Sequence, residues 1–178
     1  MFVDLEQELA KADPGDAMEL VNRRRMCEQG VEMLYVARSD SGEPIYMQWL
    51  VGPNEQHLFH RSLPHLFPHL ADGEFLVEAA FTFAAFRRMG VMSDGMHQLV
   101  ATAQALGATS VLTYVSYGNI GSLRGCAAVG FEPDHVRVTT ARMGRRRSTY
   151  VPLDDEALRE WRESVPGHEP RRTDSAQP

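Results

Sequence analysis

Residues 87–96, RRMGVMSDGM, form a stretch whose residue types could do chemistry. Two arginines precede Gly90, and apolar residues at helical spacing begin directly after it. A glycine at a helix start lets backbone N–H groups approach an anion closely, and the helix dipole favours a phosphate at that end. The stretch therefore indicates a phosphate-binding turn. Capping or solubility is the commoner meaning of so short a pattern, so a second feature is needed.

The second feature lies further along the chain. SVLTYVSY, residues 110–117, predicts a strand, and it is followed by Asn119, the short helical segment SLRGCAAV and the pair Gly130-Phe131. With RRMGVM, these segments resemble the GNAT superfamily of acetyl-CoA-dependent N-acetyltransferases, whose acyl-CoA loop has the form R/Q-x-x-G-x-G/A after the fourth strand. The resemblance extends over residues 31–145, and the two motifs together are far more specific than either alone.

The resemblance implies an α+β fold with a mixed, mostly antiparallel central sheet, flanked by helices and splayed between its fourth and fifth strands. The pantetheine arm of acetyl-CoA, the implied co-substrate, would enter at the splay. Backbone amides near Phe83, Ala84 and Ala85 would polarise the acyl carbonyl. The residues implied to bind the rest of the cofactor are Arg87, Arg88, Met89, Gly90, Val91, Met92, Asn119 and Arg124. Asn119 by itself is equally typical of a turn after a strand.

Two residues depart from the pattern that favours a phosphate at this turn. Met92 replaces the small residue of the family loop, and Asp94 places a carboxylate in the first helical turn, where it would repel a phosphate. Met92 also begins the apolar stripe of the helix. The spacing therefore favours a side chain turned toward the core rather than toward an anion outside it.

The resemblance also implies a proton acceptor on the fourth strand and a proton donor on the short helix. Glu78 is the candidate general base, with Glu74 on the same strand face. Pairing with an arginine or exposure to solvent is an equally good interpretation of Glu78. Cys126 occupies the place where many members carry a tyrosine that protonates the leaving thiolate. Its thiol could donate a proton, act as a nucleophile, or fill a small apolar space.

Periodicity and turn residues predict the elements that must position these groups. A helical segment over residues 5–12 and a helix from Asp16 to Gly30 are followed by a hairpin around residues 39–42. The segment 53–73 is rich in Pro and His and predicts a loop or a short irregular helix. From Glu74 onward the order is strand, helix, strand, helix and a pair of strands, with the predicted ranges 74–83, 92–106, 110–117, 119–130 and 131–153, and residues 153–164 could add a terminal helix.

Length and composition place further limits on the class of protein. With 178 residues, we expect a single GNAT-like domain over residues 1–163 and a disordered tail over 164–178. A net charge of -6 argues against a dedicated nucleic-acid binder. Cys27 and Cys126 lie far apart, which favours neither a disulfide nor a thiolate zinc site and suggests the cytoplasm. No membrane span is expected.

Two clusters of side chains have several possible roles. Four histidines lie in the segment 53–73, three, five and four residues apart, which fits no standard zinc site: His57, His60, His65 and His69. We therefore expect no metal there. The histidines are expected either to lie in a loop beside the acceptor or to be ordinary surface residues. Four arginines, Arg142, Arg145, Arg146 and Arg147, indicate a solvated hairpin tip or a docking site for a carrier protein or tRNA.

The sequence thus predicts an N-acyltransferase that transfers an acetyl or other acyl group from acyl-CoA to a primary amine of a small molecule or peptide by direct attack. One alternative keeps the fold but takes the acyl group from an aminoacyl-tRNA or a carrier protein. Another is a non-catalytic binding protein, since Met92 and the missing tyrosine could mark lost chemistry. The acceptor is not predicted, and a homodimer is left open.

Overall fold

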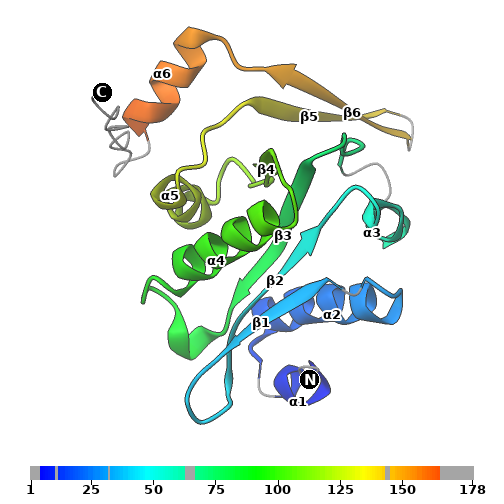
Figure 1. Ribbon diagram of the computed structural model, residues 1–178, viewed down its shortest axis with the longest axis vertical. Coiled ribbons are helices and arrows are strands. Elements are labelled where there is room, and N and C mark those ends of the chain that lie inside the picture. The colour runs from blue at the N-terminus through cyan, green and yellow to red at the C-terminus, as the bar shows by residue number, and fades with distance from the viewer. Residues whose placement is uncertain (1–4, 11, 32, 63–66, 143–144, 165–178) are drawn as a thin grey trace. The chain divides into compact units, whose positions relative to one another are not determined.

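The computed structural model describes residues 5–10, 12–31, 33–62, 67–142 and 145–164 (Figure 1). In chain order, the elements are α1 (Leu5–Leu9), α2 (Pro14–Glu28), β1 (Leu34–Arg38), β2 (Pro44–Val51), α3 (Gln56–Ser62), β3 (Glu74–Thr82), a 3₁₀ turn (Ala84–Phe86), α4 (Val91–Ala105), β4 (Ser110–Leu112), α5 (Ile120–Val129), β5 (His135–Arg142), β6 (Arg145–Pro152) and α6 (Asp155–Ser164). The chain divides into two compact units, residues 1–114 and 115–178. The predicted order of strands and helices from Glu74 onward is confirmed.

The first unit is built on a four-stranded sheet in the order β1-β2-β3-β4 (Figure 1). β1 pairs with β2 and β2 pairs with β3 antiparallel, whereas β4 runs parallel to β3. The turn between β1 and β2 is the hairpin that the sequence predicts, with Gly42 in the left-handed region at φ 84°. A mixed, mostly antiparallel sheet with helices beside it is thus confirmed, and the structure is α+β.

Helices α2 and α4 cover opposite faces of this sheet (Figure 1). Met47 and Trp49 of β2 are fully buried on the α2 side, in clusters with Leu20 and Met26 of that helix. The indole N–H of Trp49 donates to the carbonyl oxygen of Val31 at 3.0 Å, which satisfies the one polar group of this core side chain. Apolar burial on this face holds α2 against the strands that carry the candidate site.

α4 packs on β2 and β3 through a stripe of small and apolar residues. Met96, Leu99 and Ala103 are buried at helical spacing, as predicted for an amphipathic helix. Gly95 lies directly over the buried ring of Tyr46, and a Cβ at position 95 would overlap that ring. The absence of a side chain therefore allows the first turns of α4 to lie close to the sheet.

A β-bulge interrupts β3 at its centre. Met47 pairs with Phe81 and Trp49 pairs with Glu78, so that two residues, Ala79 and Ala80, lie opposite the single residue between them on β2. Ala79 has φ 57°, a left-handed conformation that costs a residue with a Cβ roughly 1–2 kcal/mol. The alternation of the sequence predicts the strand but not this bulge.

Three predicted boundaries are wrong. The first helix ends at Leu9 rather than at residue 12. α2 is capped by Asp13 rather than by Asp16, because Pro14 occupies the first helical position and the Asp13 carboxylate accepts the N–H groups of Gly15 and Asp16 at 3.0 and 2.9 Å. The strand predicted over residues 110–117 ends at Leu112. Its later residues have β-forming side chains, but they find no ladder to join on β3.

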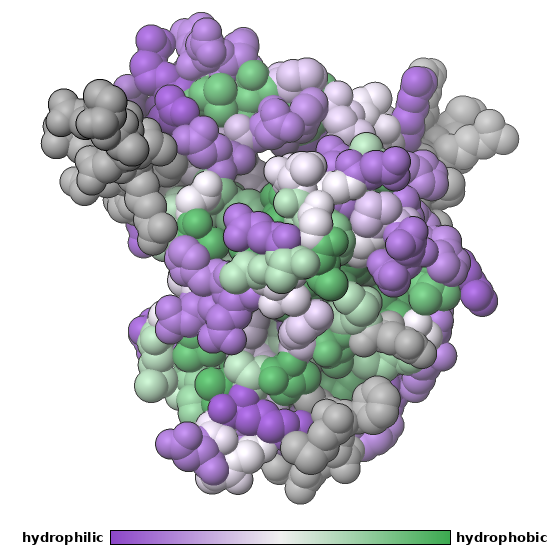
Figure 2. All heavy atoms as spheres, viewed as in Figure 1, coloured by the Kyte–Doolittle hydropathy of each residue, from purple (hydrophilic) through white to green (hydrophobic). Residues whose placement is uncertain are grey.

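The second unit contains α5, the antiparallel pair β5 and β6, and α6. The carboxamide of Asn119 caps α5 by accepting the N–H of Ser122 at 3.2 Å, and Gly130 ends the helix at φ 97°. Arg142 pairs in register with Arg145, so the basic cluster lies at the hairpin end of β5 and β6. Figure 2 shows mostly hydrophilic side chains over α6. The predicted tail lies almost wholly outside the described residues.

Candidate functional site

The junction between β3 and α4 opens a helix N-terminus to the surface. Gly90 is the N-cap, with φ 79°, and the first intrahelical hydrogen bond runs from the Asp94 N–H to the Gly90 carbonyl at 3.1 Å. The N–H groups of Gly90, Val91 and Met92 precede this bond and point out of the helix start. Among the described residues, no heavy atom outside the adjoining backbone lies within 4 Å of where a Gly90 Cβ would be. An anion could therefore approach these amides closely.

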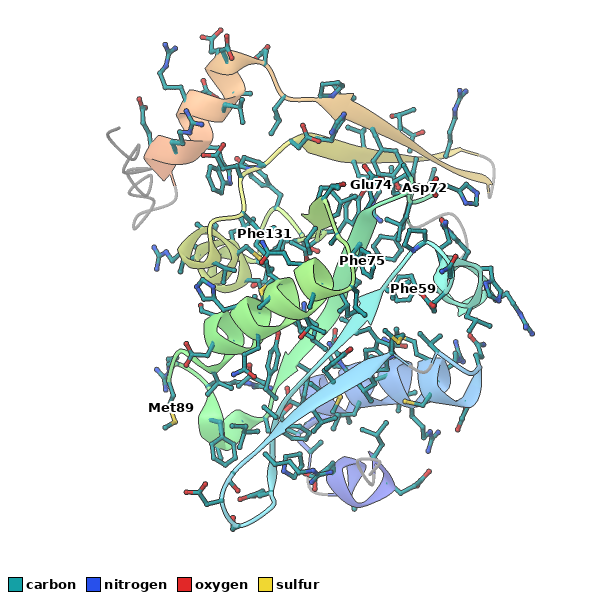
Figure 3. The ribbon with its side chains drawn as sticks, viewed as in Figure 1. Phe59, Asp72, Glu74, Phe75, Met89 and Phe131 are labelled. Atoms are coloured by element: carbon teal, nitrogen blue, oxygen red, sulfur yellow. The ribbon has the colours of Figure 1, made fainter. Side chains whose placement is uncertain are left out.

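The loop before Gly90 is exposed but partly anchored. The guanidinium of Arg87 bonds the Asp16 carboxylate of α2 at 2.5 Å and the Thr82 carbonyl at 3.0 Å, so its charge is already engaged. Arg88 is exposed and has φ 64°. Met89 is 66% exposed and points away from the body of the unit (Figure 3). Backbone amides and Arg88 are thus the groups of this loop best placed to meet a phosphate.

The two residues that depart from the family pattern lie on different sides of α4. Met92 is half-buried and precedes Met96 by one turn, so it extends the buried stripe toward the helix start. Asp94 is exposed in the first turn, where its negative charge interacts favourably with the positive end of the helix dipole. Met92 therefore does not cover the amides as an outward side chain would, while Asp94 remains a source of repulsion for a phosphate.

β3 and β4 separate soon after they pair. Their register runs from Glu74 with Ser110 to Leu76 with Leu112, and the described part of β3 beyond Leu76 is paired only with β2. The strands that the resemblance counts as fourth and fifth therefore diverge, as a splayed sheet requires. Apart from the carbonyls of Ala79 and Ala80, which Arg23 binds, the edge of β3 from residue 77 to residue 82 can pair with an extended ligand that carries amide groups.

Glu78 stands at the point of divergence. Its Oε2 accepts the N–H of Tyr114 at 3.3 Å. At Leu76 the two chain segments are joined by backbone pairing, whereas at Glu78 a side-chain carboxylate joins them. Glu74 has a different task, since its carboxylate accepts the N–H of Ala71 at 2.9 Å in the turn before β3 (Figure 3). Of the two glutamates on β3, Glu78 is the one beside the open strand edge.

Aromatic side chains line the neighbourhood of Glu78. The centroid of the Tyr114 ring lies 5.2 Å from that of Phe67, and the Phe67 centroid lies 5.0 Å from that of Phe59 in α3. Tyr114 packs against the same buried cluster as Trp49. Glu78 itself is half-buried. A carboxylate on an apolar, aromatic wall is suited to accept a proton from an amine that approaches along the strand edge.

The amides predicted to polarise a carbonyl are not equally available. The N–H of Phe83 donates to the Ile45 carbonyl at 3.1 Å and so belongs to the sheet, and the Phe83 side chain is buried. Ala84 and Ala85 are exposed, and their N–H groups precede the first hydrogen bond of the 3₁₀ turn, from Phe86 to Phe83 at 2.9 Å. Ala84 and Ala85 therefore carry the donors that could meet an acyl oxygen.

Three predicted site residues belong to the second unit. Asn119 serves α5 as its N-cap, Arg124 is exposed on the helix, and Cys126 is buried at 5% exposure. The Cys126 carbonyl accepts the N–H of Phe131 at 3.1 Å, which joins the end of α5 to the predicted Gly-Phe pair. Asn119 and Cys126 thus have structural tasks in their own unit, whereas Arg124 is an exposed side chain.

One residue of the site escapes the motifs. Arg23 of α2 is 5% exposed and donates to the carbonyl oxygens of both bulge residues, Ala79 and Ala80. A signal for it exists in the sequence, because Arg23 lies three residues after Leu20 and three before Met26, both buried. That spacing places Arg23 on the inner face of α2, whereas a run of three arginines is more often read as a solvated surface.

The histidine segment shows contacts of its own. His57 Nδ1 lies 2.9 Å from the Asn54 carbonyl, and the rings of His60 and His69 are 4.7 Å apart, while His65 falls outside the described residues. Among the residues described, no three His, Cys, Asp or Glu side chains gather as a metal site would require. No helix among the described residues of the whole chain is long and apolar enough to cross a bilayer.

Comparison with known proteins gives a limited likeness. No family model and no curated protein matches the chain. Among solved structures, it is similar to an aminoglycoside N-acetyltransferase, AAC(6')-Iy, in complex with CoA, at 21% identity and a TM-score of 0.45, over 74% of this chain and 95% of that one. It is similar to the aminoglycoside 6'-N-acetyltransferase AAC(6')-IG of Acinetobacter haemolyticus at 16% identity and a TM-score of 0.47, over 76% and 88%. It is also similar to a protein provisionally named as a phosphinothricin N-acetyltransferase, at 18% identity and a TM-score of 0.47, over 85% of this chain and 88% of that one.

Proposed function

We propose that this protein is an N-acyltransferase of the GNAT type, which transfers an acetyl or other acyl group from acyl-CoA to a primary amine of a small molecule or peptide. The observation that carries the proposal is the open start of α4 at Gly90, directly after a strand whose neighbour diverges beyond Leu76. A helix start offers amides to a pyrophosphate, and a free strand edge offers partners to the amides of a pantetheine arm. The R-x-x-G spacing of residues 87–90 supports this assignment.

In this proposal, the backbone amides of residues 88–92 receive the pyrophosphate. Arg87 anchors the loop instead, because Asp16 binds its guanidinium and its N–H donates to the Ala84 carbonyl at 3.4 Å. Arg88 supplies the positive charge. The resemblance adds Asn119 and Arg124 to the proposed cofactor ligands.

The chemistry assigned to the site is direct attack. The amine nitrogen bonds to the thioester carbonyl carbon, the C–S bond breaks, and the products are an amide and the thiol of CoA. Ala84 lies six residues after Glu78, roughly 15–20 Å along the strand direction, so Glu78 accepts the proton that the amine loses through bound water rather than directly. The N–H groups of Ala84 and Ala85 polarise the carbonyl oxygen, and Cys126 is the candidate donor of a proton to the thiolate.

Ligand-induced stabilisation tests the proposal without knowledge of the acceptor. Acetyl-CoA at a hundredfold excess over its Kd should stabilise the native state by about 2.7 kcal/mol, which raises the Tm by roughly 5–10 °C. CoA should do nearly the same, whereas adenosine diphosphate, which lacks the pantetheine arm, should do so less. Absence of any shift with millimolar acetyl-CoA would count decisively against an acyl-CoA enzyme.

Replacement of Cys126 separates its two possible tasks. Cys126→Ala should destabilise the protein by about 1 kcal/mol, because the residue is buried and a small void would remain. Turnover should fall less than about tenfold, since a thiol with a pKa near 8.5 leaves readily without an acid. Urea denaturation and a thiol-release assay measure the two effects. A loss of turnover well beyond tenfold in a folded variant would instead make Cys126 the required acid.

A further inference from the structure

The guanidinium of Arg23 is held in an unusually complete set of contacts for a charge inside a small protein. Nε donates to the Ala79 carbonyl at 3.1 Å and Nη2 donates to the Ala80 carbonyl at 2.8 Å. Nη1 bonds the Glu19 carbonyl at 2.8 Å and the Glu19 carboxylate at 2.5 Å. The Phe81 ring lies 4.9 Å from the guanidinium carbon. A fork-shaped donor therefore grips two successive peptide groups, which an ammonium could not do in the same way.

These two carbonyls belong to the β-bulge. Ala79 and Ala80 lie opposite one residue of β2, so their carbonyl groups cannot both bond to that strand. Arg23 donates a hydrogen bond to each of the two carbonyl oxygens instead. Ala79 also holds a left-handed φ of 57°, which an alanine keeps only where its surroundings impose it. Arg23 binds the carbonyl of Ala79 and that of the residue after it.

Glu78 precedes the bulge directly, so the direction of its side chain depends on the peptide that follows it. Its contact with the Tyr114 N–H is 3.3 Å long and would be lost after a small rotation of the strand. The Ala79 carbonyl that Arg23 holds belongs to the peptide group that follows the Glu78–Ala79 peptide, and Ala79, with φ 57°, joins the two planes. The position of the Glu78 carboxylate thus depends on the dihedral angles of Ala79, whose carbonyl Arg23 binds.

We propose that Arg23 is a positioning residue that aims the Glu78 carboxylate by holding the carbonyls of Ala79 and Ala80 in the β3 bulge. Its effect on turnover rests on the proposed function, in which Glu78 is the proton acceptor. Its effect on the bulge does not. Arg23 touches neither the acyl donor nor the amine, and it acts through the strand alone.

Hydrogen exchange tests the structural half of this inference. Arg23→Lys keeps the charge but not the fork, and it should speed exchange of the Tyr114 amide by about tenfold while the amide of Leu99 in α4 stays protected. Arg24→Lys is the matched control, because Arg24 lies one residue on and pairs with Glu6 and Glu28 near the surface. It should leave the Tyr114 amide unchanged. Equal acceleration of Tyr114 and Leu99, or none at Tyr114, would overturn the inference.

A double-mutant cycle tests the catalytic half. Arg23→Lys should lower kcat about tenfold with KM for acetyl-CoA within about twofold, and it should have no further effect in a Glu78→Gln background. Effects that multiply would show that Arg23 does not act through Glu78. If the native protein has no turnover at all, the proposed function fails, and the exchange rates of Tyr114 decide the inference alone.

Discussion

Glu78→Gln should lower kcat by about 100-fold or more, because a general base contributes a factor of this size to proton transfer. The substitution keeps an oxygen that can accept the Tyr114 N–H, and it keeps the volume of the side chain. The Tm should therefore change little, and KM for acetyl-CoA should stay close to its native value. Stopped assays of CoA release, together with a melting curve, measure these quantities.

Glu74→Gln is the matched control for this substitution. Glu74 lies on the same strand, and its carboxylate accepts the Ala71 N–H, a task that a carboxamide oxygen can also perform. Turnover should remain within about twofold of the native rate. Equal activities of the two variants and the native protein would remove Glu78 from the mechanism. Equal losses would point to general damage to β3.

The second large effect is expected at Gly90. Gly90→Asp should weaken acetyl-CoA binding at least tenfold, because a carboxylate at the helix start would face the pyrophosphate at close range, where like charges repel by a few kcal/mol. The added side chain enters open space, so steric overlap is not the cause. Without acetyl-CoA, the variant should be no less stable than Gly90→Asn, since a negative charge at a helix N-terminus stabilises the helix. Calorimetric titration and thermal melts give both values.

Gly90→Asn separates the charge from the backbone. Asn tolerates the left-handed conformation that Gly90 adopts, and it has nearly the shape of Asp without its charge. Its affinity for acetyl-CoA should lie within a few-fold of the native protein. If Asp and Asn weaken binding equally, the amides at the start of α4 are not the pyrophosphate site.

Much of this architecture follows from patterns in the sequence. The period of Met96, Leu99 and Ala103 predicts α4, the Ser-Gly turn predicts the first hairpin, and Gly130 predicts the end of α5. These patterns succeed because each depends on residues close together in the chain. The start of α2 is misplaced by the rival cap Asp13, since Pro14 shifts the first helical position upstream.

The candidate site is harder to predict, because its geometry comes from pairings between distant segments. Nothing near Ala79 indicates a left-handed residue, since the bulge depends on the register with β2 and on Arg23, 56 residues away. The sequence likewise marks Arg87 as a phosphate ligand, whereas Asp16, 71 residues away, binds its guanidinium. A motif predicts which residue types are present at a site, but not which of them already form hydrogen bonds or ion pairs with distant residues.

The close approach of Gly95 to Tyr46 also limits how this sequence can change. Every other residue type at position 95 would bring a Cβ into the Tyr46 ring, and that ring is itself fixed by its hydroxyl, which donates to the buried Gln48 at 2.6 Å. Positions 46 and 95 should therefore vary together among descendants of this chain, with a larger residue on α4 accompanied by a smaller one on β2. The helix that begins at Gly90 is thereby tied to an inherited pair of residues well outside the acyl-CoA loop.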